Sequence, residues 1–128
     1  MPVAARHQQT ALELAPPTAG ETTSAILAYL TLQGFAVWRQ NNSGIYDPKT
    51  TRYRFNPQGR RGVPDIIGFR KHDGLFIGVE VKAGRDQLRP GQKQFLDELK
   101  AAGGLAFVAH SFAQFQQSFE GRGLHHQL

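Results

Sequence analysis

No cysteine occurs among the 128 residues of this chain, so disulfide bonds and thiolate metal sites are both excluded. That composition fits a reducing cytoplasm. Long apolar runs are also missing, since none approaches the roughly 20 residues that a membrane-spanning helix requires, and we expect no membrane partner. The first twenty residues lack the basic, apolar and small-residue layout of a secretory signal. Without a glycine-rich phosphate loop, nucleotide hydrolysis is not indicated.

Acidic residues are few beside basic ones, and the chain carries a formal net charge of +5. The stretch from Arg39 to Gly62 holds a single acidic residue, Asp47, among many cations, and it accounts for the whole of that excess. Cations interleaved with aromatic rings suit contact with DNA phosphates and stacking on bases, although a solvated hairpin with ordinary surface arginines is the alternative. The candidate DNA contacts are Arg39, Lys49, Arg52, Tyr53, Arg54, Arg60 and Arg61.

A chain of this length suits one domain with a single core. Turn residues and apolar periodicity divide it into a flexible or helical arm at 1–17, a domain at 18–120 and a tail at 121–128. Within the domain the pattern predicts a helix, a strand, a basic hairpin, two paired strands, and then a helix, a strand and a helix. This order predicts a mixed α/β fold in which helices flank a central sheet.

Charged residues stand inside the two central strands, which we expect at 63–70 and 75–83. Side chains alternate along a strand, so Glu80 and Lys82 share one face while Val79 and Val81 share the other. Asp65 begins the preceding strand, and whether it lies across from Glu80 depends on the register of the pair. Such groups are unfavourable inside a sheet unless they face water, a partner or a metal.

Two carboxylates at close range repel, and one of them takes up a proton unless a cation joins them. A hard divalent cation with oxygen ligands removes that repulsion and also binds a phosphate oxygen. Water bound to such a cation becomes a usable nucleophile, and a nearby lysine stabilises the charge that develops on the phosphate. Asp65, Glu80 and Lys82 therefore predict a phosphodiesterase centre that uses Mg²⁺ or Mn²⁺.

Gln92 adds a neutral group to this centre. It precedes the apolar residues Phe95 and Leu99 by three and seven positions, so its amide points along the apolar stripe of the expected helix toward the sheet. A half-buried amide needs a partner, which the carboxylates, the lysine or a phosphate would supply. The alternative is a first-turn glutamine that extends into solvent.

The motifs GVPD at 62–65, EVK at 80–82 and PGQKQF at 90–95 follow one another in an order that resembles the VRR-NUC (virus-type replication-repair nuclease) domain of the PD-(D/E)xK nuclease superfamily. The resemblance covers about residues 21–111. It implies a restriction-endonuclease-like core, here with an inserted basic β-hairpin, that hydrolyses phosphodiester bonds with a divalent metal. Stand-alone members, of the phage or bacterial type, resemble dimeric endonucleases that cut branched DNA such as four-way (Holliday) junctions. The same domain also occurs in larger DNA repair nucleases.

The resemblance implies a role for each residue of these motifs. Asp65 and Glu80 would hold the metal together with the backbone carbonyl of Val81. Lys82 would be the catalytic lysine, and Gln92 would be the glutamine that the family carries on its helix. Such a nuclease would act in the cytoplasm of a bacterial or phage-infected cell.

Two residues near the motifs, Glu21 and Arg89, affect how the metal and Gln92 would be held. Glu21 matches the acidic residue that opens the family's first helix, which would make it an additional metal ligand. However, Thr18 and Glu21 also have the spacing of a capping box, and both interpretations stay open. Arg89 stands where the family commonly has a capping serine or threonine, and arginine caps a helix poorly. We therefore expect Gln92 to be held less rigidly here than in relatives.

Two other functions fit the same residues. An idle DNA-binding module would keep the fold without catalysis, but it has no need of all three charged motif residues. A sequence-specific nuclease of the restriction type would use the same core. Symmetric cutting of a junction needs two centres, so we expect a homodimer. Candidate interface pieces are the arm and the final helix with Phe112, Phe115 and Phe119, unless these pack on their own sheet. Trp38 is expected in the core, and the alternative is a strand-end tryptophan that contacts DNA beside Arg39 and Asn41.

Overall fold

The computed structural model describes residues 15–40, 45–54 and 59–125. The short helix expected in the arm and Phe55 of the hairpin lie outside these segments. In chain order the elements are α2 (Ala19–Leu32), β1 (Phe35–Arg39), β2 (Ile45–Asp47), β3 (Arg52–Arg54), β4 (Ile66–Arg70), β5 (Phe76–Val81), α3 (Pro90–Ala101), β6 (Leu105–Ala109) and α4 (Phe112–Gly121). The order expected for the domain is confirmed.

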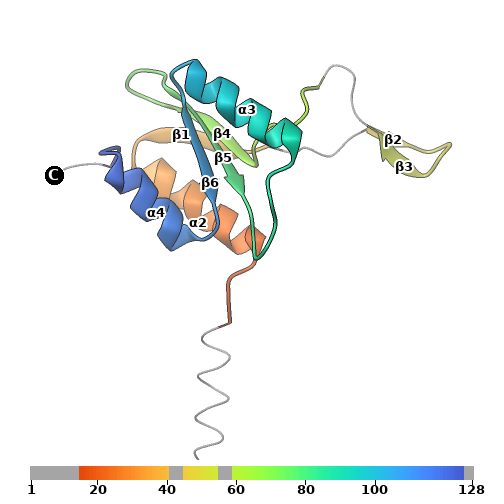
Figure 1. Cartoon of the computed structure of the whole chain (residues 1–128), viewed down its shortest axis with the longest axis horizontal. Coiled ribbons are helices and arrows are strands. Elements are labelled where there is room, and N and C mark those ends of the chain that lie inside the picture. Colours follow the sequence, from red (N-terminus) through yellow and green to blue (C-terminus); the bar gives the residue numbers. More distant parts are fainter. Residues whose placement is uncertain (1–14, 41–44, 55–58, 126–128) are drawn as a thin grey trace, which may run out of the picture.

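A four-stranded mixed sheet in the order β1-β4-β5-β6 forms the centre of the molecule. β4 pairs antiparallel with both β1 and β5. β6 runs parallel to β5, because α3 carries the chain back across the sheet between them. Figure 1 shows α2 and α4 side by side against one face and α3 against the other. This is the predicted mixed α/β core of restriction-endonuclease type, and the hairpin of β2 and β3 stands apart from it.

The start of α2 is closed by a reciprocal pair of hydrogen bonds. Oγ1 of Thr18 accepts from the backbone N–H of Glu21 at 3.1 Å, and Oε1 of Glu21 accepts from the backbone N–H of Thr18 at 3.2 Å. The capping box expected from the spacing of these residues is therefore formed. One carboxylate oxygen of Glu21 is thereby committed to the end of the helix.

Aromatic side chains fill the space between the sheet and the helix pair α2 and α4. Phe115 and Phe119 of α4 are fully buried, and both rings pack against Phe107 of β6 at centroid distances of 5.2 and 6.1 Å. Phe112 meets Tyr29 of α2 edge-on at 5.6 Å. Of the two alternatives for these phenylalanines, packing on their own sheet is confirmed for Phe115 and Phe119, which the sheet and α2 cover.

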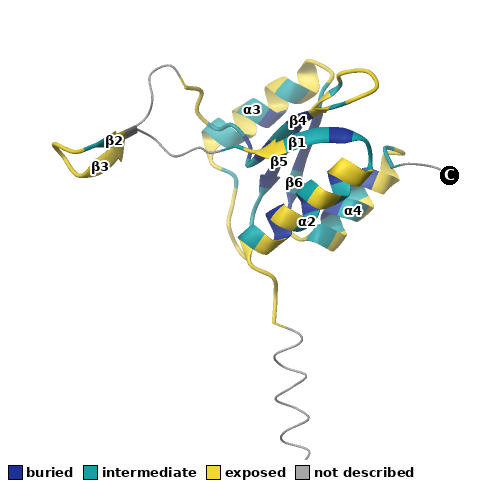
Figure 2. Ribbon diagram, turned by 180° about the vertical axis from the view of Figure 1, so that it is seen from behind, coloured by how far each residue is buried: buried dark blue, intermediate teal, exposed yellow. Residues whose placement is uncertain are grey.

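The opposite face of the sheet is covered only in part. α3 packs against β5 and β6, and Gly78 of β5 leaves room for it, since a Cβ atom there would lie 3.1 Å from both Leu99 of α3 and Pro64. Figure 2 shows the buried residues concentrated in the sheet and on the inner sides of the helices. Within the described segments, no helix is long and apolar enough to cross a membrane.

Candidate metal centre

The register between β4 and β5 decides where the two motif carboxylates lie. Ile66 pairs with Val79 at the last position of the ladder. One further step along both strands brings Asp65 opposite Glu80. Because directly opposed residues lie on the same face, both carboxylates belong to the face that α3 covers. The register that the sequence left open therefore places Asp65 and Glu80 together.

Asp65 is held by the strands on both of its sides. Its backbone carbonyl accepts from the N–H of Gln40 at 2.7 Å, which extends the pairing of β1 with β4. Its side-chain Oδ2 accepts from the backbone N–H of Val81 at 2.8 Å. These two contacts fix the carboxylate at the end of β4, with its second oxygen left for another partner.

Glu80 is the buried member of the pair, with only 3% of its surface exposed. Its Oε1 accepts from Nε2 of Gln92 at 3.2 Å, whereas its Oε2 is buried without a hydrogen-bond partner in the described structure. Burial, and after it the neighbouring carboxylate of Asp65, raise the pKa of Glu80 to about 8, although Lys82 and Arg89 act in the opposite direction. Lys82 offsets only part of the repulsion that the two carboxylates have when both are ionised.

Gln92 joins the first turn of α3 to the pair of carboxylates. Its Oε1 accepts from the backbone N–H of Arg89 at 2.9 Å, so its amide nitrogen is turned toward Glu80. The expectation that Arg89 leaves Gln92 loosely placed is wrong, because the glutamine supplies the reverse half of a capping box itself. The half-buried amide thus finds its partner in the carboxylate.

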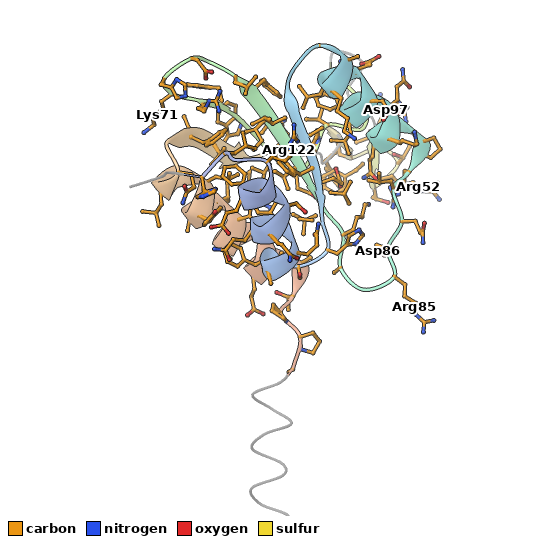
Figure 3. The ribbon with its side chains drawn as sticks, turned by 60° about the vertical axis from the view of Figure 1, so that its left-hand side comes forward. Arg52, Lys71, Arg85, Asp86, Asp97 and Arg122 are labelled. Atoms are coloured by element: carbon orange, nitrogen blue, oxygen red, sulfur yellow. The ribbon has the colours of Figure 1, made fainter. Side chains whose placement is uncertain are left out.

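Lys82 lies on the same face, two residues beyond Glu80. Its backbone N–H donates to the carbonyl of Ala109 at 2.9 Å, which keeps the end of β5 against β6. Its Nζ lies 3.8 Å from Oε1 of Glu80, and its side chain is only 11% exposed. A cation is thus positioned beside the carboxylates and near the surface. Beyond it, the loop from Ala83 to Arg89 extends outward, with Arg85 and Asp86 at its outer end (Figure 3).

The backbone carbonyl of Val81 lacks a partner in the ladder. The N–H of Lys82 points toward β6, so by alternation the N–H and the carbonyl of Val81 point toward β4. The residue opposite Val81 in the register is Pro64, which has no N–H to donate. This carbonyl is therefore a further oxygen ligand available beside Asp65 and Glu80.

These oxygen atoms fit a hard divalent cation. The unpartnered Oε2 of Glu80, the carboxylate of Asp65 and the carbonyl of Val81 offer the oxygen donors that Mg²⁺ and Mn²⁺ prefer. Among the residues that the structure describes, no three His, Asp or Glu side chains gather into a metal-binding group. Glu21 accordingly acts as a cap of α2, and its alternative role as a third carboxylate ligand finds no support.

The segment that precedes Asp65 is tied to α3. The guanidinium of Arg60 lies over the ring of Phe95 at 4.7 Å and forms an ion pair with Glu98. Gly62 has a φ of +77°, and a Cβ atom there would lie 2.2 Å from the backbone oxygen of Gly91. Gly62 therefore packs on the first turn of the helix that carries Gln92, and Arg60 packs farther along the same helix. Arg60, one of the predicted DNA contacts, is engaged in this packing.

The basic hairpin of β2 and β3 presents an exposed surface. Lys49 and Arg52 are exposed, and the rings of Tyr46 and Tyr53 pack against each other at 5.3 Å while 50% and 69% of these residues stay exposed. Figure 1 shows the hairpin extending from the side of the molecule where α3 begins. The side chain of Arg54 lies outside the described structure. The predicted hairpin is confirmed.

Two residues near the centre were missed or misplaced by sequence reasoning. Trp38, expected in the core, is 46% exposed. Alternation along β1 would have separated it from the buried Phe35, because the two residues point to opposite faces. The sequence pattern identifies Gly62 only as part of the GVPD motif, yet this glycine allows two backbones to approach closely. A glycine that follows two arginines in a turn is the sequence feature that indicates such an approach.

The chain matches a known protein family over most of its described length. Residues 31–113 match the family model described as the VRR-NUC domain. This segment contains Asp65, Glu80, Lys82 and Gln92, and it leaves out Glu21. No curated protein matches the chain.

Proposed function

Since this chain belongs to the VRR-NUC family and is therefore a nuclease domain acting on DNA, we propose that it is a Mg²⁺- or Mn²⁺-dependent endonuclease for branched DNA. The observation that carries this proposal is the buried Glu80, whose unpartnered Oε2 lies beside the carboxylate of Asp65. Two acids kept this close, with a repulsion that Lys82 only partly offsets, would be unfavourable in a protein of purely structural role.

Asp65, Glu80 and the carbonyl of Val81 would hold the cation. When bound, a divalent cation supplies an acidified water as nucleophile and stabilises negative charge on the phosphate oxygens. The chain's own residues prepare the site for this chemistry. The Val81 N–H fixes the orientation of Asp65, and Gln92 fixes that of Glu80. Each carboxylate thus uses one oxygen for these hydrogen bonds, and the other oxygen would be the metal ligand.

Lys82 would act directly on the substrate. Its Nζ lies beside Glu80, and the buried stem limits the positions that the ammonium group can take. A cation fixed in a place of low exposure stabilises the charge that grows on a phosphate in the transition state more strongly than the same cation in water. We assign Lys82 to this role, and we assign Gln92 to positioning Glu80.

The hairpin of β2 and β3 would grip the DNA backbone. Lys49 and Arg52 supply exposed cations, and the exposed ring pair of Tyr46 and Tyr53 supplies a flat apolar surface. Arg39, Arg54 and Arg61 belong to the same proposed contact surface. Arg60 is left out, because it is engaged with Phe95 and Glu98. The hairpin extends beyond the sheet, so it would reach a second arm of a branched substrate.

The proposed unit of action is a homodimer on a four-way junction. In the described part of the chain Asp65 and Glu80 would form one such centre, and one centre would hydrolyse one strand. Cutting two strands symmetrically requires two copies related by a twofold axis. Cleavage of this kind would serve DNA repair, where junctions must be separated into duplexes. A restriction-type nuclease would differ by cutting continuous duplex at a fixed sequence.

The test is a cleavage assay on end-labelled DNA. Continuous duplex, single strands, flaps and four-way junctions are incubated with the protein, with and without Mg²⁺ or Mn²⁺, and its mass on the junction is measured by light scattering. We expect nicks at the branch point of the junction, only with metal, from a dimer. Cutting of continuous duplex at one sequence would favour the restriction type. Binding to every DNA without cleavage would leave the idle module.

The contribution of the hairpin is tested by the double variant Lys49→Ala with Arg52→Ala. Each lost phosphate contact lowers the slope of log affinity against log salt by about 0.9, so we expect the slope to fall by roughly 2 and the affinity for all DNA to fall alike. The matched control is Lys71→Ala with Lys100→Ala, which removes the same charge from exposed positions elsewhere. Lys71 lies on the other side of the molecule from Arg52 (Figure 3). Equal slopes in the two double variants would contradict a grip by the hairpin.

A further inference from the structure

Trp38 is a large aromatic residue near the metal centre that no helix or strand of the described segments covers. It is 46% exposed on β1, an edge strand. Figure 2 shows β1 changing from buried to exposed toward the end where Trp38 lies. α3 packs against β5 and β6 on this face of the sheet, and among the described residues no helix lies over the half of this face formed by β1 and β4.

The register places Trp38 in the row next to the carboxylates. Trp38 pairs with Ile67 of β4, which in turn pairs with Gly78 of β5, and Gly78 faces α3. The next row on the same face consists of Gln40, Asp65 and Glu80. Diagonal neighbours on adjacent antiparallel strands lie about 7–8 Å apart, which is within reach of an aromatic side chain. The indole therefore borders the site where the phosphate would bind.

Charge indicates what kind of partner meets this surface. Lys82 lies on the same face beside Glu80, and the exposed Arg89 begins α3 close enough to act on the Glu80 carboxylate. An apolar ring on the same face of the sheet as these cations fits a partner that is both anionic and aromatic. A nucleotide next to the scissile phosphate has this combination of properties, because its base offers a flat face and its backbone offers charge.

We propose that Trp38 stacks on a base face exposed at the branch point, and that this contact selects branched over continuous DNA. The inference rests on the proposed function and specifies how the substrate is chosen. In a continuous duplex each base is covered by its neighbours on both sides, so the indole finds no free face there. At a branch point or flap the stack is interrupted, and the terminal base presents one face to the protein.

The single tryptophan of the sequence is also the reporter. The full-length chain carrying Glu80→Gln is titrated without metal, so that no strand is cut, with single-stranded DNA, a flap, a four-way junction and a continuous duplex. Fluorescence of Trp38 reports stacking, and anisotropy of labelled DNA reports binding. We expect quenching with the first three DNAs and none with the continuous duplex, although the duplex also binds.

Trp38→Ala is expected to weaken binding to flaps and junctions by roughly 5- to 150-fold, the range that one base–aromatic stack provides. Binding to continuous duplex is expected to stay unchanged, and Trp38→Phe is expected to restore part of the loss. The matched control is Phe69→Ala. Phe69 is 41% exposed on the same face, but it lies one row farther from the carboxylates, and we expect its removal to leave all affinities unchanged.

Three outcomes would overturn the proposal: equal quenching by continuous duplex, an equal loss of affinity for every DNA in Trp38→Ala, or a dimer that Trp38→Ala dissociates without DNA. The last result would assign this face to a second copy of the chain. Wild-type protein is assayed for cleavage with Mg²⁺ in parallel. Quenching by branched DNA together with no cleavage would reject the proposed nuclease activity and keep the role of Trp38.

Discussion

Glu80→Gln is expected to lower the cleavage rate by a factor on the order of a thousand or more while the domain stays folded. The amide has the shape of the carboxylate and still accepts from Gln92, but it removes the negative charge that would hold the cation. Loss of metal-assisted charge stabilisation is worth several kcal/mol, and each ~1.4 kcal/mol is a tenfold change in rate. The rate is measured on a labelled junction, and binding by anisotropy.

The same variant is expected to change how stability depends on pH. Burial and Asp65 raise the pKa of Glu80 from its usual value of 4.5 to about 8. Between these values the folded, metal-free protein binds a proton that the unfolded chain has lost. Its free energy of unfolding therefore falls as pH rises through this window, by at most about 1.4 kcal/mol per unit. Thermal unfolding should show this slope in the metal-free wild type and not in Glu80→Gln.

Asp97→Asn is the control for both measurements. Asp97 is an exposed carboxylate on α3, paired with Lys93 at 2.8 Å on the outer side of the helix (Figure 3). Its neutralisation should leave cleavage and the pH slope as in the wild type. Because a cation competes with the proton on Glu80, added Mg²⁺ should stabilise the wild type increasingly toward pH 8. Normal cleavage by Glu80→Gln would remove the metal centre from the proposal.

Gly62→Ala is expected to be strongly destabilising although it adds only one methyl group. The backbone of Gly62 has a φ of +77°, and a methyl group there would lie 2.2 Å from the oxygen and 2.4 Å from the carbonyl carbon of Gly91. Left-handed geometry alone is unfavourable by about 1–2 kcal/mol for a residue with a Cβ. The overlap is with backbone, so no side-chain rotation relieves it. We expect a loss of roughly 2–4 kcal/mol in the free energy of unfolding.

The variant should also impair cleavage, because the residue that must yield is the one before Gln92. Gly74→Ala separates the two causes. Gly74 has a φ of +79° in the β4–β5 turn, and a Cβ atom there meets nothing within 4 Å. It should therefore show the conformational penalty alone, with normal cleavage. Chemical denaturation gives the stabilities of both variants. Equal losses at the two positions would mean that the contact with Gly91 is unimportant.

Much of the site could be predicted from strand alternation. The period of two places Glu80 and Lys82 on one face whatever the fold, and the helical period points Gln92 toward the sheet. The turn at Asp73-Gly74 indicated an antiparallel pair, but turn chemistry alone leaves the register open by a residue. The structure resolves it through Ile66 and Val79. Local patterns therefore predicted which residues meet, and tertiary packing determined how they meet.

What the sequence could not predict depends on contacts between distant segments. Whether the phenylalanines of α4 lie inside or outside is decided by the position of α2 and β6, not by the pattern of α4. The sequence predicts Arg60 as a cation for DNA contact, but the fold brings Phe95 and Glu98 against its guanidinium. Trp38 lies outside the core because α3 stops short of β1, and the width of a sheet relative to one helix cannot be inferred from spacing.

The missing N–H of Pro64 has a consequence for the whole sheet. The ladder between β4 and β5 ends at the pair of Ile66 and Val79. Beyond this pair the carbonyl of Val81 has no hydrogen bond in the ladder, next to the carboxylates of Asp65 and Glu80. The separation follows from the covalent structure of proline and does not depend on a bulky side chain. Because the pyrrolidine ring of Pro64 cannot donate a hydrogen bond, the ladder between β4 and β5 ends at the site in every copy of the protein.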